Sequence, residues 1–241
     1  MRYLKSTLLA GLMLLAGPLL AQSKIYLEPR LGVGTFSMKS MKEFQEMVIE
    51  ELEVNAKAVD NYGPYFQYGF NVAKSLNEDD RVGLFLERGS TGGRVAYKDY
   101  SGEVQVDTKL RYTSLGAFIY TLNPIKESEV KFIRGIEASL FFSKLKLESY
   151  SRIYSQSASS TEKFNSLGFG FKPFVGLQYP LFDMPTTLSL GYMLNASGAF
   201  HVPGDSDQYL VRNKYGSEKL EPSWSGLRLN LSVAFPIFKH K

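Results

Sequence analysis

Apolar residues alternate with small or polar residues in eight segments of the chain. In the last of these, Leu227, Leu229 and Leu231 alternate with Arg228 and Asn230. Because successive side chains of a β-strand point to opposite faces, each segment predicts a strand with one apolar face and one small or polar face. The eight predicted strands are 25–34, 65–73, 82–87, 107–121, 132–142, 166–179, 187–195 and 226–235.

The face opposite the apolar one is rich in Gly, Ser and Asn, with an occasional charged residue. Such groups suit a narrow polar barrel interior, and an outward face with almost no Lys or Glu suits contact with lipid. Segment 107–121 is β-rich, but its two faces and its register are not resolved by the pattern. The structural alternative is a soluble, lipocalin-like binding barrel, whose apolar faces would turn inward around a ligand.

Long and short connections alternate along the predicted strands. The short ones are 76–80, 122–129 and 180–186, and the long ones are 37–63, 89–105, 146–164 and 197–224. Outer-membrane barrels have short periplasmic turns, long outer loops and an even number of strands. A sheet in hydrocarbon must also close, because an open edge leaves backbone groups unpaired. The pattern predicts an all-β fold, an eight-stranded antiparallel up-and-down transmembrane β-barrel.

The first 21 residues have the layout of a secretory signal peptide. Arg2 and Lys5 precede an apolar run over 8–16, and a small residue stands at Ala21. The run is too short for a helix that must cross about 30 Å of hydrocarbon with about 20 residues. We expect cleavage after Ala21, export to the bacterial outer membrane, and a barrel formed by residues 22–241.

Composition narrows the possible chemistry. The chain has no Cys, which excludes disulfides, thiolate metal sites and thiol catalysis, and it has only two His. A net charge of +4 is too small to indicate nucleic-acid binding by itself. We therefore expect no cofactor, no metal site and no nucleic-acid partner.

The first predicted outer loop contains a helical pattern. Met41, Phe44, Val48 and Leu52 recur at spacings of three, four and four residues, which places them on one helix face. This predicts an amphipathic helix over about 38–59 in the first extracellular loop. Its apolar face either caps the barrel rim and the other loops or docks a partner protein.

Six charged residues lie on the predicted inward face, three of each sign. Burying any of them alone would be costly, so we expect them to pair inside the barrel. A salt-bridged plug is the structural interpretation, and a gated ion or proton path is the functional alternative. The residues of this predicted lumen network are Glu28, Arg30, Glu87, Glu137, Lys172 and Arg228.

The candidate residues for an enzymatic role are Ser197, His201 and Asp205. Outer-membrane lipid A deacylases use a Ser-His-acid group with His as general base. Residues four apart in an extended chain lie about 13 Å apart, so these three would not meet without a turn. Val202-Pro203 after His201 also departs from the His-x-Ser arrangement of that family. We expect no catalytic activity.

Two places in the sequence resemble known bacterial export features. The Leu-Leu-Ala21-Gln22 junction is similar to those of exported Bacteroidota proteins. The last strand, with aromatic Phe235 and Phe238, resembles the C-terminal signal read by the barrel-assembly machinery, although three residues follow Phe238. The mature chain as a whole resembles the small outer-membrane β-barrels of Gram-negative bacteria, in the OmpA/OmpX-like and PorT-like group.

These expectations lead to a functional hypothesis. The chain would be a non-enzymatic structural or adhesive scaffold in the outer membrane, surrounded by lipid and lipopolysaccharide, with outer loops available to an extracellular or envelope protein partner. The alternative is a narrow channel or a transport or secretion accessory, which the PorT-like resemblance implies.

Overall fold

The computed structural model describes residues 24–52, 54–205, 207–211 and 218–238. The predicted signal peptide lies outside the described residues. Within them, no helix is long and apolar enough to cross a membrane. The elements are β1 (Ile25–Gly34), α2 (Lys39–Glu51), β2 (Lys57–Asn61), β3 (Tyr65–Ser75), β4 (Asp80–Lys98), β5 (Gly102–Pro124), β6 (Lys131–Ile153), β7 (Gln156–Leu181), β8 (Met184–Ser197), β9 (Gly226–Val233) and β10 (Phe235–Phe238).

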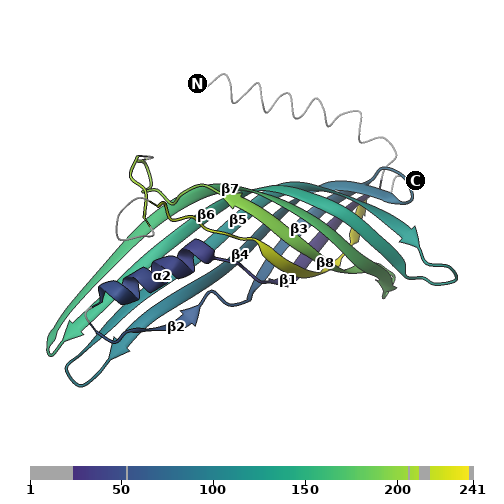
Figure 1. Cartoon of the computed structure of the whole chain (residues 1–241). Coiled ribbons are helices and arrows are strands. Elements are labelled where there is room, and N and C mark those ends of the chain that lie inside the picture. Colours follow the sequence, from purple (N-terminus) through teal and green to yellow (C-terminus); the bar gives the residue numbers. More distant parts are fainter. Residues whose placement is uncertain (1–23, 53, 206, 212–217, 239–241) are drawn as a thin grey trace.

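Eight of these strands form a closed antiparallel ring (Figure 1). Strands β1 and β3 to β9 pair in chain order, and β1 pairs with β9 to close the barrel. Strand β10 continues β9 along the start of β1, where Ile25 lies opposite Phe238. Strand β2 lies off the ring and pairs with β4. The predicted eight-stranded up-and-down barrel is confirmed.

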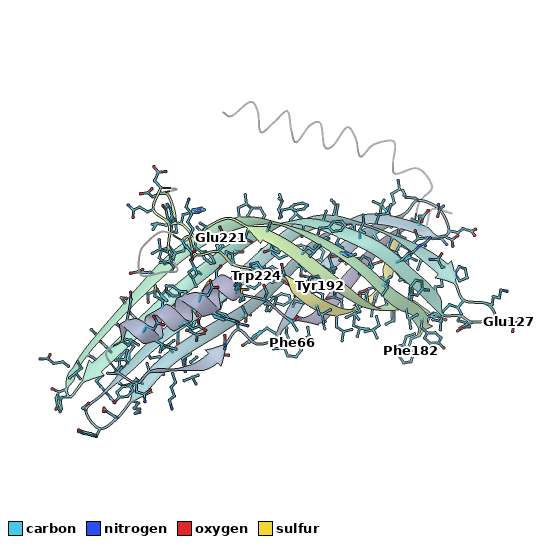
Figure 2. The ribbon with its side chains drawn as sticks, viewed as in Figure 1. Phe66, Glu127, Phe182, Tyr192, Glu221 and Trp224 are labelled. Atoms are coloured by element: carbon cyan, nitrogen blue, oxygen red, sulfur yellow. The ribbon has the colours of Figure 1, made fainter. Side chains whose placement is uncertain are left out.

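The apolar face of the barrel wall points outward. Leu31 is 65% exposed and Phe66 is 76% exposed, whereas inward Lys172 is only 1% exposed. Figure 2 shows Phe66 pointing away from the wall. In β5 the faces that the sequence left unresolved are clear, with Leu115 exposed and Phe118 buried. The soluble alternative is wrong, because it requires the opposite orientation of these faces.

Inward glycines make room for aromatic rings in the lumen. Phe118 lies opposite Gly83, and Phe85 lies opposite Gly116. A Cβ on Gly83 would stand 2.5 Å from Phe118, and a Cβ on Gly116 would stand 2.6 Å from Phe85. The Gly-rich inner face thus allows side chains to fill the barrel, as expected for eight strands.

The prediction of two long loops is wrong, because both segments consist mostly of strand. Segment 89–105 belongs mostly to β4 and β5, and 146–164 belongs mostly to β6 and β7. Strands β6 and β7 have 23 and 26 residues, more than twice the roughly 9–11 needed to cross a bilayer. We call the part beyond the barrel the outer sheet: 89–98, 102–112, 143–153 and 156–166. It projects from the barrel in Figure 1.

The predicted helix is also shorter than expected. It ends at Glu51 because Leu52 has extended backbone angles, and 57–61 pairs with β4 as a strand instead of continuing the helix. Helix α2 lies along the outer sheet (Figure 1). Met41 and Phe44 are buried there, while Val48 and Leu52 are partly buried.

Candidate functional site

Four of the six predicted lumen charges form one cluster at the centre of the barrel, the central ion cluster. Arg30 on β1 contacts Glu87 on β4 at 2.6 Å and Glu137 on β6 at 2.7 Å. Lys172 on β7 contacts Glu137 at 2.8 Å. All four side chains are buried. Two positive and two negative charges therefore balance one another away from water, and together they tie four strands across the lumen.

Glu28 is separate from this cluster. Its carboxylate lies 3.6 Å from the guanidinium of Arg81 and accepts hydrogen bonds from Asn71 and Tyr120. The Arg81 guanidinium also lies over the Tyr26 ring, at 4.3 Å. Sequence reasoning missed Arg81, although it shares the odd-numbered, inward parity of Glu87 on the same strand.

Arg228 makes no ion pair with the other described residues. Its guanidinium donates hydrogen bonds to the backbone carbonyls of Thr35, Trp224 and Leu227, and lies 4.6 Å from the centre of the Phe36 ring. Arg228 therefore joins the segments that enter and leave the barrel rim, and it does not belong to the central ion cluster.

An aromatic plug closes the lumen on the outer side of the central ion cluster. Trp224 packs against Tyr112 at 4.6 Å and Phe36 at 5.2 Å between ring centres, and donates to Ser143 through its indole N–H. The Tyr112 hydroxyl donates to Glu87 at 2.8 Å, which connects the plug to the cluster. Trp224 shares the even parity of inward Arg228, which is the signal that could have found it.

The other end of the lumen is filled as well. A second apolar cluster lies at the end of the barrel away from the outer sheet, with Tyr26 and Phe174 packed against it. The central ion cluster is thus enclosed by apolar side chains on both sides. The residues of the second apolar cluster are Ala73, Phe85, Phe118, Tyr120, Leu122 and Ile133.

The inner face of the outer sheet is covered by α2 and by the connection that follows β8. Gln45 of α2 donates to the backbone carbonyls of Asp60 and Arg94, at 2.8 and 3.1 Å. The Tyr62 and Thr108 hydroxyls are 2.6 Å apart. The buried apolar residues between the outer sheet and its cover include Met41, Phe44, Leu110, Leu145, Phe164, Phe200 and Leu220.

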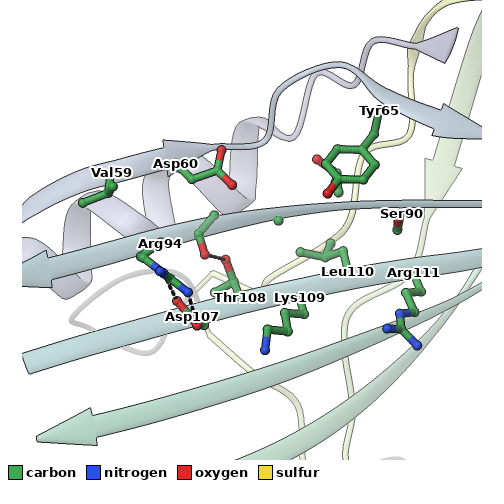
Figure 3. Close-up of a pocket in the computed structure, with 13 residues that line it drawn as sticks. Val59, Asp60, Tyr65, Ser90, Arg94, Asp107, Thr108, Lys109, Leu110 and Arg111 are labelled. Carbon is green, nitrogen blue, oxygen red and sulfur yellow. Dashed lines mark hydrogen bonds and ion pairs between the residues drawn. The ribbon is translucent and has the colours of Figure 1, made fainter.

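The opposite face of the outer sheet carries two adjoining hollows. Figure 3 shows the first, of about 470 Å³, beside the ion pair of Arg94 with Asp107. Arg94 contacts the two carboxylate oxygens at 2.6 and 2.9 Å, and this raises the pKa of Arg94. The second, of about 740 Å³, shares Ser90 and Arg111 with the first. Together they follow the outward face of β4 and β5.

Near these hollows, Glu148 is held by two lysines. Its carboxylate contacts Lys109 on β5 and Lys146 on its own strand. Hydrogen bonds from these ammonium groups lower the pKa of Glu148 to about 2. Glu148 therefore neutralises part of the positive charge on this face at neutral pH.

The residues considered for catalysis do not bond with one another. The His201 ring is 3.0 Å from the Ala199 carbonyl through Nδ1, and the Ser197 hydroxyl donates to Asn195. Asp205 accepts the backbone N–H of Asp207. Among the described residues, no group of His, Asp and Glu has the arrangement needed to hold a metal ion.

The two aromatics of the predicted assembly signal lie on the closing strand. Phe235 is 42% exposed on the outer wall, and it pairs with Leu27. Phe238 pairs through its backbone with Ile25. Recognition by the assembly machinery stays a prediction.

Comparisons with known proteins add three solved structures. No protein-family model and no curated protein matches the chain. The structure is similar to Neisserial surface protein A (NspA), with a TM-score of 0.42, 18% identity, and coverage of 88% of this chain and 97% of that one. Ail, the attachment invasion locus protein of Yersinia pestis, gives a TM-score of 0.35, 13% identity and coverage of 89% and 99%. Ail in complex with the heparin analogue sucrose octasulfate gives a TM-score of 0.37, 14% identity, and coverage of 89% of this chain and 99% of that one. The fold assignment rests on the hydrogen-bonded ring itself.

Proposed function

We propose that this chain is a non-enzymatic scaffold of the bacterial outer membrane that presents the outer sheet to an extracellular or envelope protein partner. The observation behind the proposal is the outer sheet itself, in which four barrel strands extend well beyond the length that lipid requires. A membrane anchor alone would not need it.

The tips of the outer sheet support a role in protein contact. Tyr100 is 99% exposed in the turn between β4 and β5, and Tyr154 is 78% exposed in the turn between β6 and β7. Ile153 beside it is also exposed. Exposed aromatic and aliphatic groups are enriched at binding surfaces, so the tips are the best candidates for partner contact.

The filled lumen favours a scaffold over a channel. Trp224, Tyr112 and Lys172 are almost completely buried, and the charges of the central ion cluster are paired. We expect no sustained openings of the purified protein in planar bilayers. Sustained openings that disappear in Glu137→Gln or Arg228→Gln variants would instead support the channel alternative.

Adherence tests the proposed role. Cells that display the full chain should bind a surface coated with extracellular-matrix proteins better than vector cells do. A Tyr100→Ser, Ile153→Ser, Tyr154→Ser variant should lose this gain. The control is Phe182→Ser, because Phe182 is 84% exposed in a turn at the opposite end of the barrel (Figure 2). Equal adherence of the tip variant and the control, or no gain over vector cells, would refute the proposal.

Export and location are tested separately. We propose cleavage after Ala21, assembly of 22–241 through a signal that includes Phe235 and Phe238, and residence in the outer membrane. The mature protein should begin at Gln22 by mass spectrometry. It should also fractionate with outer membranes and migrate faster on gels before boiling than after. Recovery of a soluble periplasmic protein without this shift would contradict the location.

A further inference from the structure

Basic side chains form a row on the outward face of four adjacent strands, immediately beyond the apolar band of the wall. On β6, apolar Phe142 is followed by Lys144 on the same face, and on β7 Leu167 is preceded on that face by Asn165 and Lys163. The described parts of β1, β8 and β9 carry no outward Lys or Arg. The members of this basic row are Arg88, Lys109, Arg111, Lys144, Lys146 and Lys163.

Like charges face each other across the strands of the basic row. Arg111 lies directly opposite Lys144, and Lys146 lies directly opposite both Lys109 and Lys163. Directly opposed side chains have Cβ atoms about 4.5–5.5 Å apart, and like charges at this distance destabilise a sheet. The arrangement therefore costs stability unless an anion lies against it.

The charges are only partly balanced within the protein. Glu148 pairs with Lys109 and Lys146. Within the described part of the chain, Arg88, Arg111 and Lys144 have no carboxylate at ion-pair distance. All three are exposed, and all three line the 740 Å³ hollow.

The hollow combines these cations with apolar surface. Phe66, Tyr68 and Phe142 line it together with the three cations. Phe66 is 76% exposed and belongs to the apolar band. A ligand here would contact cations on the side toward the outer sheet and apolar side chains on the side toward the apolar band. An anionic lipid fits both, because its headgroup is charged and its acyl chains are apolar.

We propose that the basic row binds the phosphate groups of an outer-leaflet glycolipid, such as the lipid A part of lipopolysaccharide, with its acyl chains against Phe66, Tyr68 and Phe142. Arginine binds phosphate through charge-assisted, often bidentate hydrogen bonds. The inference rests on the proposed outer-membrane location, but it is independent of the proposed adhesive role, because the tips are not part of the hollow.

The test measures binding of bisphosphorylated lipid A to the full-length protein in detergent, by titration followed with native mass spectrometry. Arg88→Gln, Arg111→Gln and Lys144→Gln together should weaken binding about tenfold or more through the loss of charge-assisted hydrogen bonds. Glu148→Gln should tighten it, because Lys109 and Lys146 are then free to contact phosphate. Dephosphorylated lipid A should bind weakly to every variant.

The matched control changes the same number of cations elsewhere. Lys98 and Arg152 are exposed near the tips and pair with Glu103, and Lys126 lies in a turn at the opposite end. Their combined change to Gln should leave lipid A binding unchanged. The heat-dependent gel shift verifies that each variant is folded.

Three results would overturn the proposal. Equal binding by the triple variant and its control would show that the basic row is not the site. Equal binding of dephosphorylated lipid A would show that acyl contacts alone suffice. Displacement of lipid A by an equal concentration of inorganic phosphate would assign the site to free phosphate.

Discussion

The barrel parts and the outer-sheet parts of β5, β6 and β7 have opposite patterns of apolar and polar positions. In the barrel, Leu115 and Phe142 point outward and are exposed, and polar Glu137 points inward. In the outer sheet, Leu110 and Leu145 point inward and are buried, and the outward positions nearest the barrel, Arg111 and Lys144, are basic. The same strand thus reverses which of its faces is apolar. Lipid covers the outer face of the barrel, and α2 covers the inner face of the outer sheet.

Alternation in the sequence therefore shows that one face of a strand is covered by apolar surroundings, but it does not show on which side of the sheet that face lies. The apolar positions of β6 change from even to odd numbers between Phe142 and Leu145. In the sequence, a continuous strand whose apolar positions shift from even to odd numbers looks like a strand followed by a loop.

The largest effect is expected from Arg30→Met in the barrel. It would leave Glu87 and Glu137 buried without their shared partner, and breaking a buried ion pair costs about 3–5 kcal/mol. The free energy of unfolding in urea, measured in detergent, should fall by this amount, whereas outward Arg88→Met should change it little.

A second substitution sharpens this result. Arg30→Met with Glu137→Gln keeps Glu87 and Lys172 as one charge of each sign, so part of the lost free energy should return. If the double variant loses as much free energy of unfolding as the two single variants lose in sum, the two residues do not share an ion cluster.

The next effect is expected in the outer sheet alone. Met41→Ala removes a fully buried side chain between α2 and the sheet, and a buried Met→Ala change costs about 2–5 kcal/mol. Amide hydrogen exchange should accelerate in α2 and the outer sheet, while the barrel keeps its heat-dependent gel shift. Exposed Glu46→Ala on the same helix is the control. A loss of the shift in Met41→Ala would mean that the two parts fold as one unit.

The smallest effect concerns acid on the outer sheet. Because the pKa of Glu148 is lowered to about 2, its ion pairs stabilise the folded state above the ordinary carboxyl range and are lost as pH falls toward 2. A carbon NMR titration of this carboxyl should find its midpoint near 2. Lys109→Gln with Lys146→Gln should raise that midpoint. An unchanged midpoint in the double variant would remove the lysines as its cause.

The sequence by itself determined the barrel, because lipid imposes one apolar face on each strand and closure on the sheet. It also identified which charges point inward, since parity along a strand is a local property. Parity places Arg30 and Glu137 on the inward faces of their strands.

Only the tertiary structure decided which of those charges meet. Arg30 and Glu137 are separated by 107 residues, and their contact depends on the register of the whole ring. The Ser-rich start of β7 has no alternation of its own and is a strand because β6 pairs with it. Helix α2 ends early for the same reason, since 57–61 pairs with β4. Pairing partners are distant in sequence, so local pattern cannot specify them.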